Sequence, residues 1–202
     1  MFERLRLHAE RPQARLIAHA AEYLRKGAGA VVPTDATYAL MALPTALDAL
    51  SGFSSLRRLD DQHLWSLICS DLSQAASYVR MDNEAHRILR RCLPGPYTFI
   101  LPANSQLPKR VFGKRRDVGL RIPQHAVCQM LLQELGEPLL ATSLIFPGET
   151  DAAIDPDLFV ERLKSQNLLV MDAGWGGLEP TTVVDLCGEA PELIRQGAGD
   201  WQ

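Results

Sequence analysis

The sequence lacks any long hydrophobic run. No stretch of its 202 residues approaches the roughly 18 uninterrupted apolar residues that a transmembrane helix needs. The N-terminal stretch MFERLRLHAERPQAR carries charges throughout and contains no apolar core of the signal-peptide type. Both absences predict a cytoplasmic protein without a membrane partner.

Cysteine is scarce and never paired in sequence. The four cysteines, Cys69, Cys92, Cys128 and Cys187, are far apart, lie in apolar surroundings and form no C-x-x-C motif. This spacing argues against a zinc or redox site. Because free cysteine behaves as a small hydrophobic residue, we expect four buried thiols.

Motifs for several common catalytic sites are also absent. The chain contains no G-x-x-x-x-G-K-[ST], no G-x-S-x-G and no histidine pair at metal-binding spacing. We therefore predict no metal site fixed by the protein. His63 and His125 lie at the edges of predicted elements, which favours a capping or surface role over a role as a base.

The net charge of −3 is small, but the charges are unevenly distributed. From Arg57 to Arg121 there are 12 Lys and Arg against 6 acids, 12 − 6 = +6, and the remainder therefore carries −9. The densest part contains Lys109, Arg110, Lys114, Arg115 and Arg116. Such a basic segment either binds phosphate groups, as in RNA or nucleotides, or is a solvated loop, and the sequence leaves both open.

Apolar periodicity predicts helices and strands in irregular alternation. The predicted helices are Gln13–Lys26, 45–59, 71–79, 82–93, 124–136 and 157–165, and the predicted strands are 30–33, 37–43, 64–70, 97–103, 118–123, 138–145, 167–174, 181–187 and 192–197. The mixture predicts an α/β or α+β fold with a mixed twisted sheet. At 47% hydrophobic residues, the chain is expected to form a single domain over residues 1–202.

Polar residues, mostly threonine, serine and arginine, recur at the ends of the predicted strands. The first cluster, Pro33 to Thr37, interrupts an apolar stretch, and later ones contain Arg121, Ser143, Thr181 and Arg195. Strand ends are where such folds bind ligands. Arginine suits phosphate and carboxylate groups, so these residues predict a pocket for an anionic ligand.

Taken in order, the polar segments resemble the motifs of the YrdC-like family of threonylcarbamoyl-AMP synthases. The similarity extends from about residue 13 to residue 199. The matching segments are PTDATYAL (Pro33 to Leu40), PGPYTFILPA (Pro94 to Ala103), VGLRIP (Val118 to Pro123), ATSLIFPGE (Ala141 to Glu149), PTTVVDL (Pro180 to Leu186) and LIRQGA (Leu193 to Ala198).

The resemblance implies an open twisted α/β sheet with a concave, electropositive cavity. The family condenses L-threonine, bicarbonate and ATP, with Mg²⁺, into threonylcarbamoyl-adenylate for tRNA modification. By resemblance, the residues that bind substrate or nucleotide are Thr34, Arg58, Arg121, Ser143, Thr181 and Arg195. Some members bind RNA, so tRNA or double-stranded RNA is an expected partner of the basic segment.

Three positions depart from the family motifs. Leu56 and Arg58 stand where the family has a K-x-R pair, Ala36 replaces a threonine, and Ile145 replaces the asparagine of S-x-N. The aliphatic segment TSLIFPGE, together with LRRLDDQH, resembles the YciO subgroup. Two hypotheses stay open: an enzyme of threonylcarbamoyl-adenylate chemistry, including hydrolysis of the adenylate, or a nucleotide- or RNA-binding protein without synthase turnover. No catalytic residue is assigned.

Overall fold

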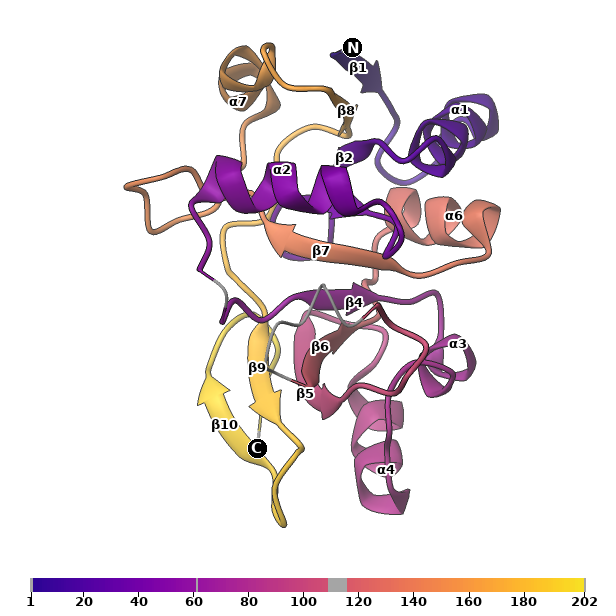
Figure 1. The fold of residues 1–202 in the computed structure, drawn as a ribbon, viewed down its shortest axis with the longest axis vertical. Coiled ribbons are helices and arrows are strands. Elements are labelled where there is room, and N and C mark those ends of the chain that lie inside the picture. Colours follow the sequence, from indigo (N-terminus) through magenta and orange to yellow (C-terminus); the bar gives the residue numbers. More distant parts are fainter. Residues whose placement is uncertain (1, 61, 109–115, 202) are drawn as a thin grey trace.

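The strands form one mixed sheet in the computed structural model, which describes residues 2–60, 62–108 and 116–201. Across the sheet the order is β1-β8-β2-β3-β7-β4-β6-β5-β9-β10. The bounds are β1 Glu3–Arg6, β2 Gly29–Val32, β3 Ala39–Ala42, β4 Ser66–Ile68, β5 Tyr97–Pro102, β6 Asp117–Arg121, β7 Leu139–Ser143, β8 Leu168–Asp172, β9 Thr182–Asp185 and β10 Glu192–Arg195. In Figure 1 the sheet runs from β1 and β8 at the top to β9 and β10 at the lower left.

Parallel and antiparallel pairs alternate irregularly across this sheet. β8 pairs in parallel with both β1 and β2, whereas β3 is antiparallel to β2 and β7. Farther along, β4 is parallel to β6 and β5 is parallel to β9. The predicted mixed α/β fold is confirmed.

Six helices of the described part of the chain lie beside the sheet. They are α1 Ala14–Arg25, α2 Leu47–Arg57, α3 Leu72–Ala76, α4 Asn83–Cys92, α6 Ala126–Leu135 and α7 Pro156–Leu163. Figure 1 shows α1 and α6 side by side, and α1 also packs on β2, while α2 packs on β3. None of the helices in the described part of the chain is both long and apolar enough to cross a membrane.

Local signals fix several helix ends. The side chains of Asp71 and Asp82 accept hydrogen bonds from Gln74 N and Ala85 N, both at 2.8 Å, and so cap α3 and α4. Gly136 ends α6 with a positive φ of 71°, a conformation that glycine adopts at low cost. These ends agree with the predicted helices.

Strand β1 was not predicted. Its residues are mostly charged, and the apolar alternation that reveals a strand is absent from ERLR. The strand forms because it pairs in parallel with β8 and because Arg4 donates to Asp172 of that strand at 2.7 Å. Arg4 and Asp172 are 168 positions apart, so their contact produces no local sequence pattern from which the strand could be predicted.

The expectation of four buried thiols is half right. Cys69 and Cys128 are buried, and burial raises the pKa of each thiol to about 12. Cys92 is only partly buried, and Cys187 is exposed because it lies in the turn after β9, where its N–H donates to Asp185. All four cysteines are free.

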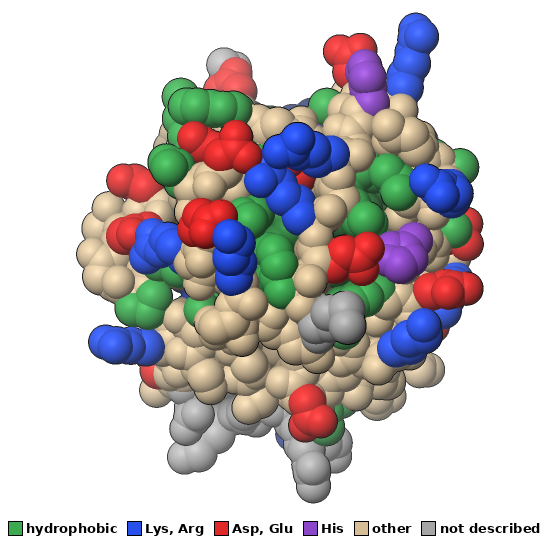
Figure 2. Space-filling model, turned by 90° about the horizontal axis from the view of Figure 1, so that it is seen from above, with side chains coloured by type: hydrophobic (Ala, Val, Ile, Leu, Met, Phe, Trp, Pro, Cys, Tyr) green, Lys and Arg blue, Asp and Glu red, His purple; other side chains and the backbone are tan. Residues whose placement is uncertain are grey.

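Charges of both signs are interspersed over the end of the molecule that carries β1 and α7. Figure 2 looks onto this end and shows Lys and Arg beside Asp and Glu, with apolar side chains between them. The described ion pairs here include Arg4 with Asp157 at 2.5 Å and Arg162 with Glu149 at 2.6 Å. This face therefore has no dominant charge in that view.

Candidate functional site

A cavity of about 170 Å³ lies where residues of seven strands meet. It is lined by Ala39, Leu64, Ser66, Thr98, Arg121, Ala141, Thr142, Ser143, Thr181, Val183 and Arg195. β3 and β10 both contribute, although six strand spacings separate them in the sheet. A flat sheet would hold these strands about 29 Å apart, at about 4.8 Å per spacing. The sheet must therefore curl to assemble this cavity.

Arg121 is the buried charge of the site. Its Nη2 donates to Asp35 at 3.0 Å and to Thr34 Oγ1 at 3.3 Å, and both side chains of the ion pair are less than a tenth exposed. Asp35 also accepts from Gln124 N at 2.9 Å. Burial lowers the pKa of Arg121, and the charge of Asp35 raises it. The Nε of Arg121 is buried without a hydrogen-bond partner among the described residues, so it can still donate to a ligand.

The polar cluster after β2 holds this arginine. Thr34 Oγ1 donates to Thr37 O at 2.7 Å and accepts from Ala36 N at 3.1 Å, which closes a tight loop. We had expected the Thr34 hydroxyl to point into the cavity. It is instead engaged within the loop and by Arg121, and Thr34 is not among the cavity-lining residues. The strand is thus interrupted to place Asp35 and Thr34 against Arg121.

Thr181 and Arg195 form the opposite wall. Arg195 donates through Nε and Nη2 to Thr181 O at 3.2 and 2.9 Å, and Thr181 Oγ1 lies 2.8 Å from Thr98 Oγ1. Burial, followed by the positive charge of Arg121, lowers the pKa of Arg195. Two guanidinium groups that repel each other across one cavity favour an anion between them.

The loop that leads into Thr181 packs tightly against the loop that follows β2. A Cβ on Gly177 would lie 2.0 Å from Ala36 O, closer than any side chain permits. Tyr38 Oη fastens the same loop by donating to Gly174 O at 2.7 Å. The two loops therefore hold each other in place beside the cavity.

The structure places Arg58 away from the predicted cluster. Arg58 is exposed and ends α2 with a positive φ of 54°, and the cavity-lining residues do not include it. Its neighbour Arg57 turns inward, where Nε donates to Ile145 O at 3.3 Å and Nη1 donates to Thr142 Oγ1. Arg57 follows the buried Leu50 and Phe53 at i+7 and i+4, so helical periodicity places it on their face. That signal could have identified Arg57.

His63 is neither a cap nor a surface residue, contrary to the expectation. It is half-buried, and its Nε2 lies 3.0 Å from Thr142 Oγ1. Its ring packs edge-on against Trp65, with 5.4 Å between the ring centroids. Thr142 and His63 were both missed because a single threonine within a strand, or a single histidine between a helix and a strand, carries no distinctive pattern. His125 does lie at the N-cap of α6, without a capping bond from its side chain.

The remaining predicted site residues are Ser143 and the basic segment. Ser143 lies in the cavity wall at the end of β7. Of the basic segment, Lys109, Arg110, Lys114 and Arg115 lie outside the described residues. Arg116 is exposed, and its carbonyl accepts from Ala103 N at 2.7 Å. The RNA-binding role of this segment stays a prediction.

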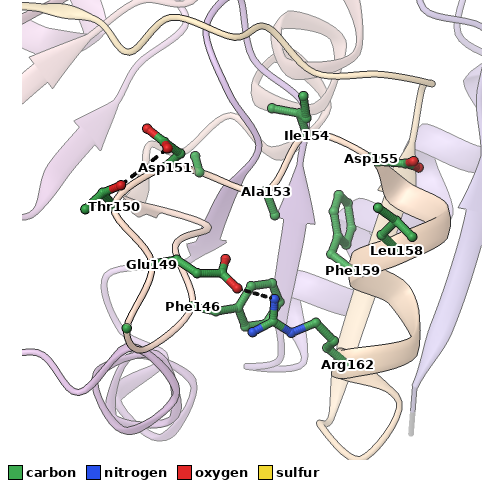
Figure 3. Close-up of a pocket in the computed structure, with 12 residues that line it drawn as sticks. Phe146, Glu149, Thr150, Asp151, Ala153, Ile154, Asp155, Leu158, Phe159 and Arg162 are labelled. Atoms are coloured by element: carbon green, nitrogen blue, oxygen red, sulfur yellow. Dashed lines mark hydrogen bonds and ion pairs between the residues drawn. The ribbon is translucent and has the colours of Figure 1, made fainter.

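A second cavity, of about 460 Å³, lies between α7 and the loop after β7. Figure 3 shows Arg162 reaching from α7 over Phe146, with 3.5 Å between the guanidinium carbon and the ring centroid. Arg162 also donates to Glu149 at 2.6 Å, so the charged groups at this end pair with each other. The residues predicted to bind ligand do not line this cavity.

The described residues include no group of three His, Cys, Asp or Glu side chains that could hold a metal ion. The first cavity carries two guanidinium groups, which are positively charged, beside hydroxyls, which can donate or accept hydrogen bonds. These groups favour an anionic ligand over a cation.

Comparisons with known proteins agree with this fold. The crystal structure of E. coli YciO superposes with a TM-score of 0.95 at 40% identity and covers 99% of this chain and 98% of YciO. Sua5 of P. abyssi, solved in complex with L-threonine, has a TM-score of 0.87 at 24% identity; the match covers 98% of this chain but 57% of Sua5. A threonylcarbamoyl-AMP synthase of Neisseria gonorrhoeae is 34% identical, with 90% of this chain and 98% of the synthase covered.

A family model also matches most of the chain. The model for Sua5, YciO and YrdC proteins, described as "Telomere recombination", matches residues 22–197. YciO of E. coli strain K12, an uncharacterised protein, is 40% identical over 195 residues. The chain belongs to the Sua5/YciO/YrdC family.

Proposed function

We propose that this protein acts in threonylcarbamoyl-adenylate chemistry, either forming the adenylate from L-threonine, bicarbonate and ATP or hydrolysing it. The observation that carries the proposal is the joint presence of Arg121 and Arg195 in one cavity with the hydroxyls of Thr98, Ser143 and Thr181. All the reactants are anions or carry a carboxylate, and guanidinium groups bind both phosphate and carboxylate. Such an adenylate would link the protein to tRNA modification.

Two relatives support the choice of substrate. The synthase of N. gonorrhoeae carries the reaction in its name, and the Sua5 structure contains L-threonine. The cavity of about 170 Å³ is smaller than the roughly 300–1,000 Å³ of sites that enclose a drug-sized ligand. It therefore suits one amino acid or one phosphate group, with the rest of the nucleotide outside, and Mg²⁺ would arrive with the phosphates of ATP.

The side chains favour catalysis by positioning and charge stabilisation. In synthesis, the amine of L-threonine and bicarbonate give threonylcarbamate and water, and an oxygen of the carbamate group then attacks the α-phosphorus of ATP as pyrophosphate leaves. In hydrolysis, water cleaves the mixed anhydride to AMP and threonylcarbamate. Charge grows on phosphate oxygens in synthesis, and the guanidinium groups of Arg121 and Arg195 are held ready to stabilise it.

Binding without turnover is the second candidate. It is favoured by Ile145 and Ala36, which place apolar groups where the resembling motifs have an amide and a hydroxyl. Ala36 is only 2% exposed and lies against Gly177, so no space for an additional ligand contact exists there. A lost hydrogen bond to a charged ligand group removes about 1.5–3 kcal/mol.

Mass spectrometry of two reactions tests the proposal. The first supplies ATP, L-threonine, bicarbonate and Mg²⁺ and follows threonylcarbamoyl-adenylate and pyrophosphate. The second supplies the adenylate, made beforehand by an active synthase, and follows AMP. Threonine-dependent pyrophosphate, or AMP release above the uncatalysed rate, supports the enzyme, and Arg195→Gln should abolish it. Binding of ATP or RNA with neither activity supports the second candidate.

A further inference from the structure

Arg57, Thr142 and His63 form a chain of hydrogen bonds at one wall of the cavity. Arg57 Nη1 donates to Thr142 Oγ1, and the same oxygen lies 3.0 Å from His63 Nε2. Thr142 is 5% exposed and lines the cavity, whereas the other two side chains reach it from α2 and from the segment before β4. Three separate elements therefore meet at one hydroxyl.

The Thr142 hydroxyl can take part in both hydrogen bonds. Arginine has no acceptor, so Thr142 Oγ1 accepts from Arg57, and its second lone pair and its own hydrogen are both available to His63 Nε2. When the hydroxyl donates to Nε2, the neutral imidazole carries its hydrogen on Nδ1. Since both bonds engage the Thr142 hydroxyl, this group serves the chain of hydrogen bonds and not a ligand.

Arg57 is the member that can still bind a ligand. Its Nε donates to Ile145 O at 3.3 Å and its Nη1 to Thr142. No described residue accepts from Nη2, which is therefore left as a donor. The position is half-buried, and burial lowers the pKa of Arg57. A guanidinium fixed at two of its nitrogens loses little entropy when the third meets a phosphate or carboxylate oxygen.

Burial and the charge of Arg57 keep His63 neutral. Together they lower the pKa of His63 to about 4, and Asp60 partly offsets them. A protonated imidazole could no longer accept from Thr142 and would face the Arg57 charge. The arrangement in which Thr142 donates to His63 therefore requires the neutral imidazole.

We propose that His63 is a positioning residue, which through Thr142 fixes Arg57 at the cavity to bind a phosphate or carboxylate oxygen of the ligand. This inference rests on the proposed function, because it assigns a role within the same anion site. Arg57 is not itself among the cavity-lining residues, but it contacts Thr142, which is one of them.

A double-mutant cycle on binding of ATP with Mg²⁺, at fixed ionic strength, tests the proposal. His63→Leu should weaken ATP binding about tenfold, which corresponds to one lost charge-assisted contact, and His63→Gln should restore most of it by offering an amide to Thr142. In an Arg57→Gln background, His63→Leu should change the affinity less than about twofold, because its effect passes through Arg57. The exposed His86→Leu on α4 is the matched control.

Multiplicative effects of His63→Leu and Arg57→Gln would overturn the proposal, as would an unchanged affinity in His63→Leu. NMR of the His63 ring nitrogens gives an answer without any ligand. We expect the Nδ1–H tautomer at pH 6 in the parent and a higher pKa in Arg57→Gln. A parent His63 that is protonated near pH 6.5 overturns the proposal. A parent that shows this coupling but neither binds ATP nor processes the adenylate contradicts the proposed function instead.

Discussion

At the scale of single residues, the ion pair with Asp35 orients Arg121, which lines the cavity. Its two side chains are 7% and 8% exposed, so neither charge has water to replace a lost partner. Such pairs add little net stability, yet removing one partner is costly because the other stays buried and charged. The pair therefore fixes where Arg121 points.

Asp35→Ala should destabilise the protein by about 3–5 kcal/mol, since it leaves Arg121 unpaired. Asp35→Asn should cost less, because its amide oxygen can still accept from Gln124 N. Urea unfolding measures both. Glu161→Ala breaks the exposed pair with Lys164 and should cost less than about 1 kcal/mol. Equal losses in Asp35→Ala and Glu161→Ala would show that the Arg121 pair is not buried.

His63 should make stability depend on pH. The pKa of His63 is lowered to about 4 in the folded protein, whereas an unperturbed histidine has a pKa of 6.5. Between these two pH values the unfolded chain therefore binds more protons than the folded protein. Stability therefore falls as the pH drops from 6.5 to 4, at up to about 1.4 kcal/mol per pH unit. Urea unfolding at several pH values should give a flatter slope for His63→Gln than for the parent or His86→Gln. Identical slopes in all three contradict the pKa shift.

Sequence reasoning reached some site residues and not their partners. Arg121, Ser143, Thr181 and Arg195 were predicted from their positions at strand ends, and they line one cavity; whether they bind ligand stays a prediction. Thr34 was assigned to the ligand although its hydroxyl holds a loop, because a motif does not show where a hydroxyl points. The motif match pointed to Arg58, although the spacing from Leu50 and Phe53 along α2 places Arg57 on the buried face of the helix.

At the scale of elements, the two loops that meet at Gly177 and Ala36 hold the site together. One follows β2 and carries Asp35, and the other precedes β9 and carries Thr181. Glycine is required at the contact because a Cβ on residue 177 would lie 2.0 Å from a backbone oxygen. Because of this close contact, a displacement of one loop requires a displacement of the other.

Gly177→Ala should lower the free energy of unfolding by about 1–3 kcal/mol, the usual cost of overpacking, and weaken ligand binding through Thr181. Gly52→Ala is the matched control. Gly52 lies within α2 with nothing within 4 Å of the added Cβ, so alanine should stabilise the helix by roughly 0.5–1 kcal/mol. Thermal unfolding of both variants measures the difference. A neutral Gly177→Ala would mean that the loops are not locked.

Elements with local signals were predicted and those without them were missed. Asp71 and Asp82 predict the starts of α3 and α4, because each caps its helix through a hydrogen bond from a residue only three positions away. β1 is held by β8, far along the chain, and by the pair of Arg4 with Asp172. The strand order was equally out of reach, since pairing of β3 with β7 depends on contacts about a hundred positions apart.

At the scale of the whole molecule, the second candidate function predicts a salt effect. If the basic segment binds RNA, Lys109→Ala with Arg110→Ala should reduce the slope of log K against log [salt] by about two, since each phosphate contact contributes about one. The control is Lys26→Ala with Lys164→Ala, since both lysines are distant in sequence from the basic segment. Fluorescence anisotropy with double-stranded RNA and tRNA provides the measurement. An unchanged slope would assign the segment to solubility.

The curl of the sheet has a consequence for how the protein is made. The cavity includes Ala39 from β3 and Arg195 from β10, which lie 156 positions (195 − 39) apart in the chain. Chains are synthesised from the N-terminus at about 5–20 residues per second, so most of the sheet is translated several seconds before Arg195. A nascent chain that has not yet added β10 therefore lacks the part of the cavity wall that Arg195 provides, and the cavity is complete only once this strand has joined its neighbours.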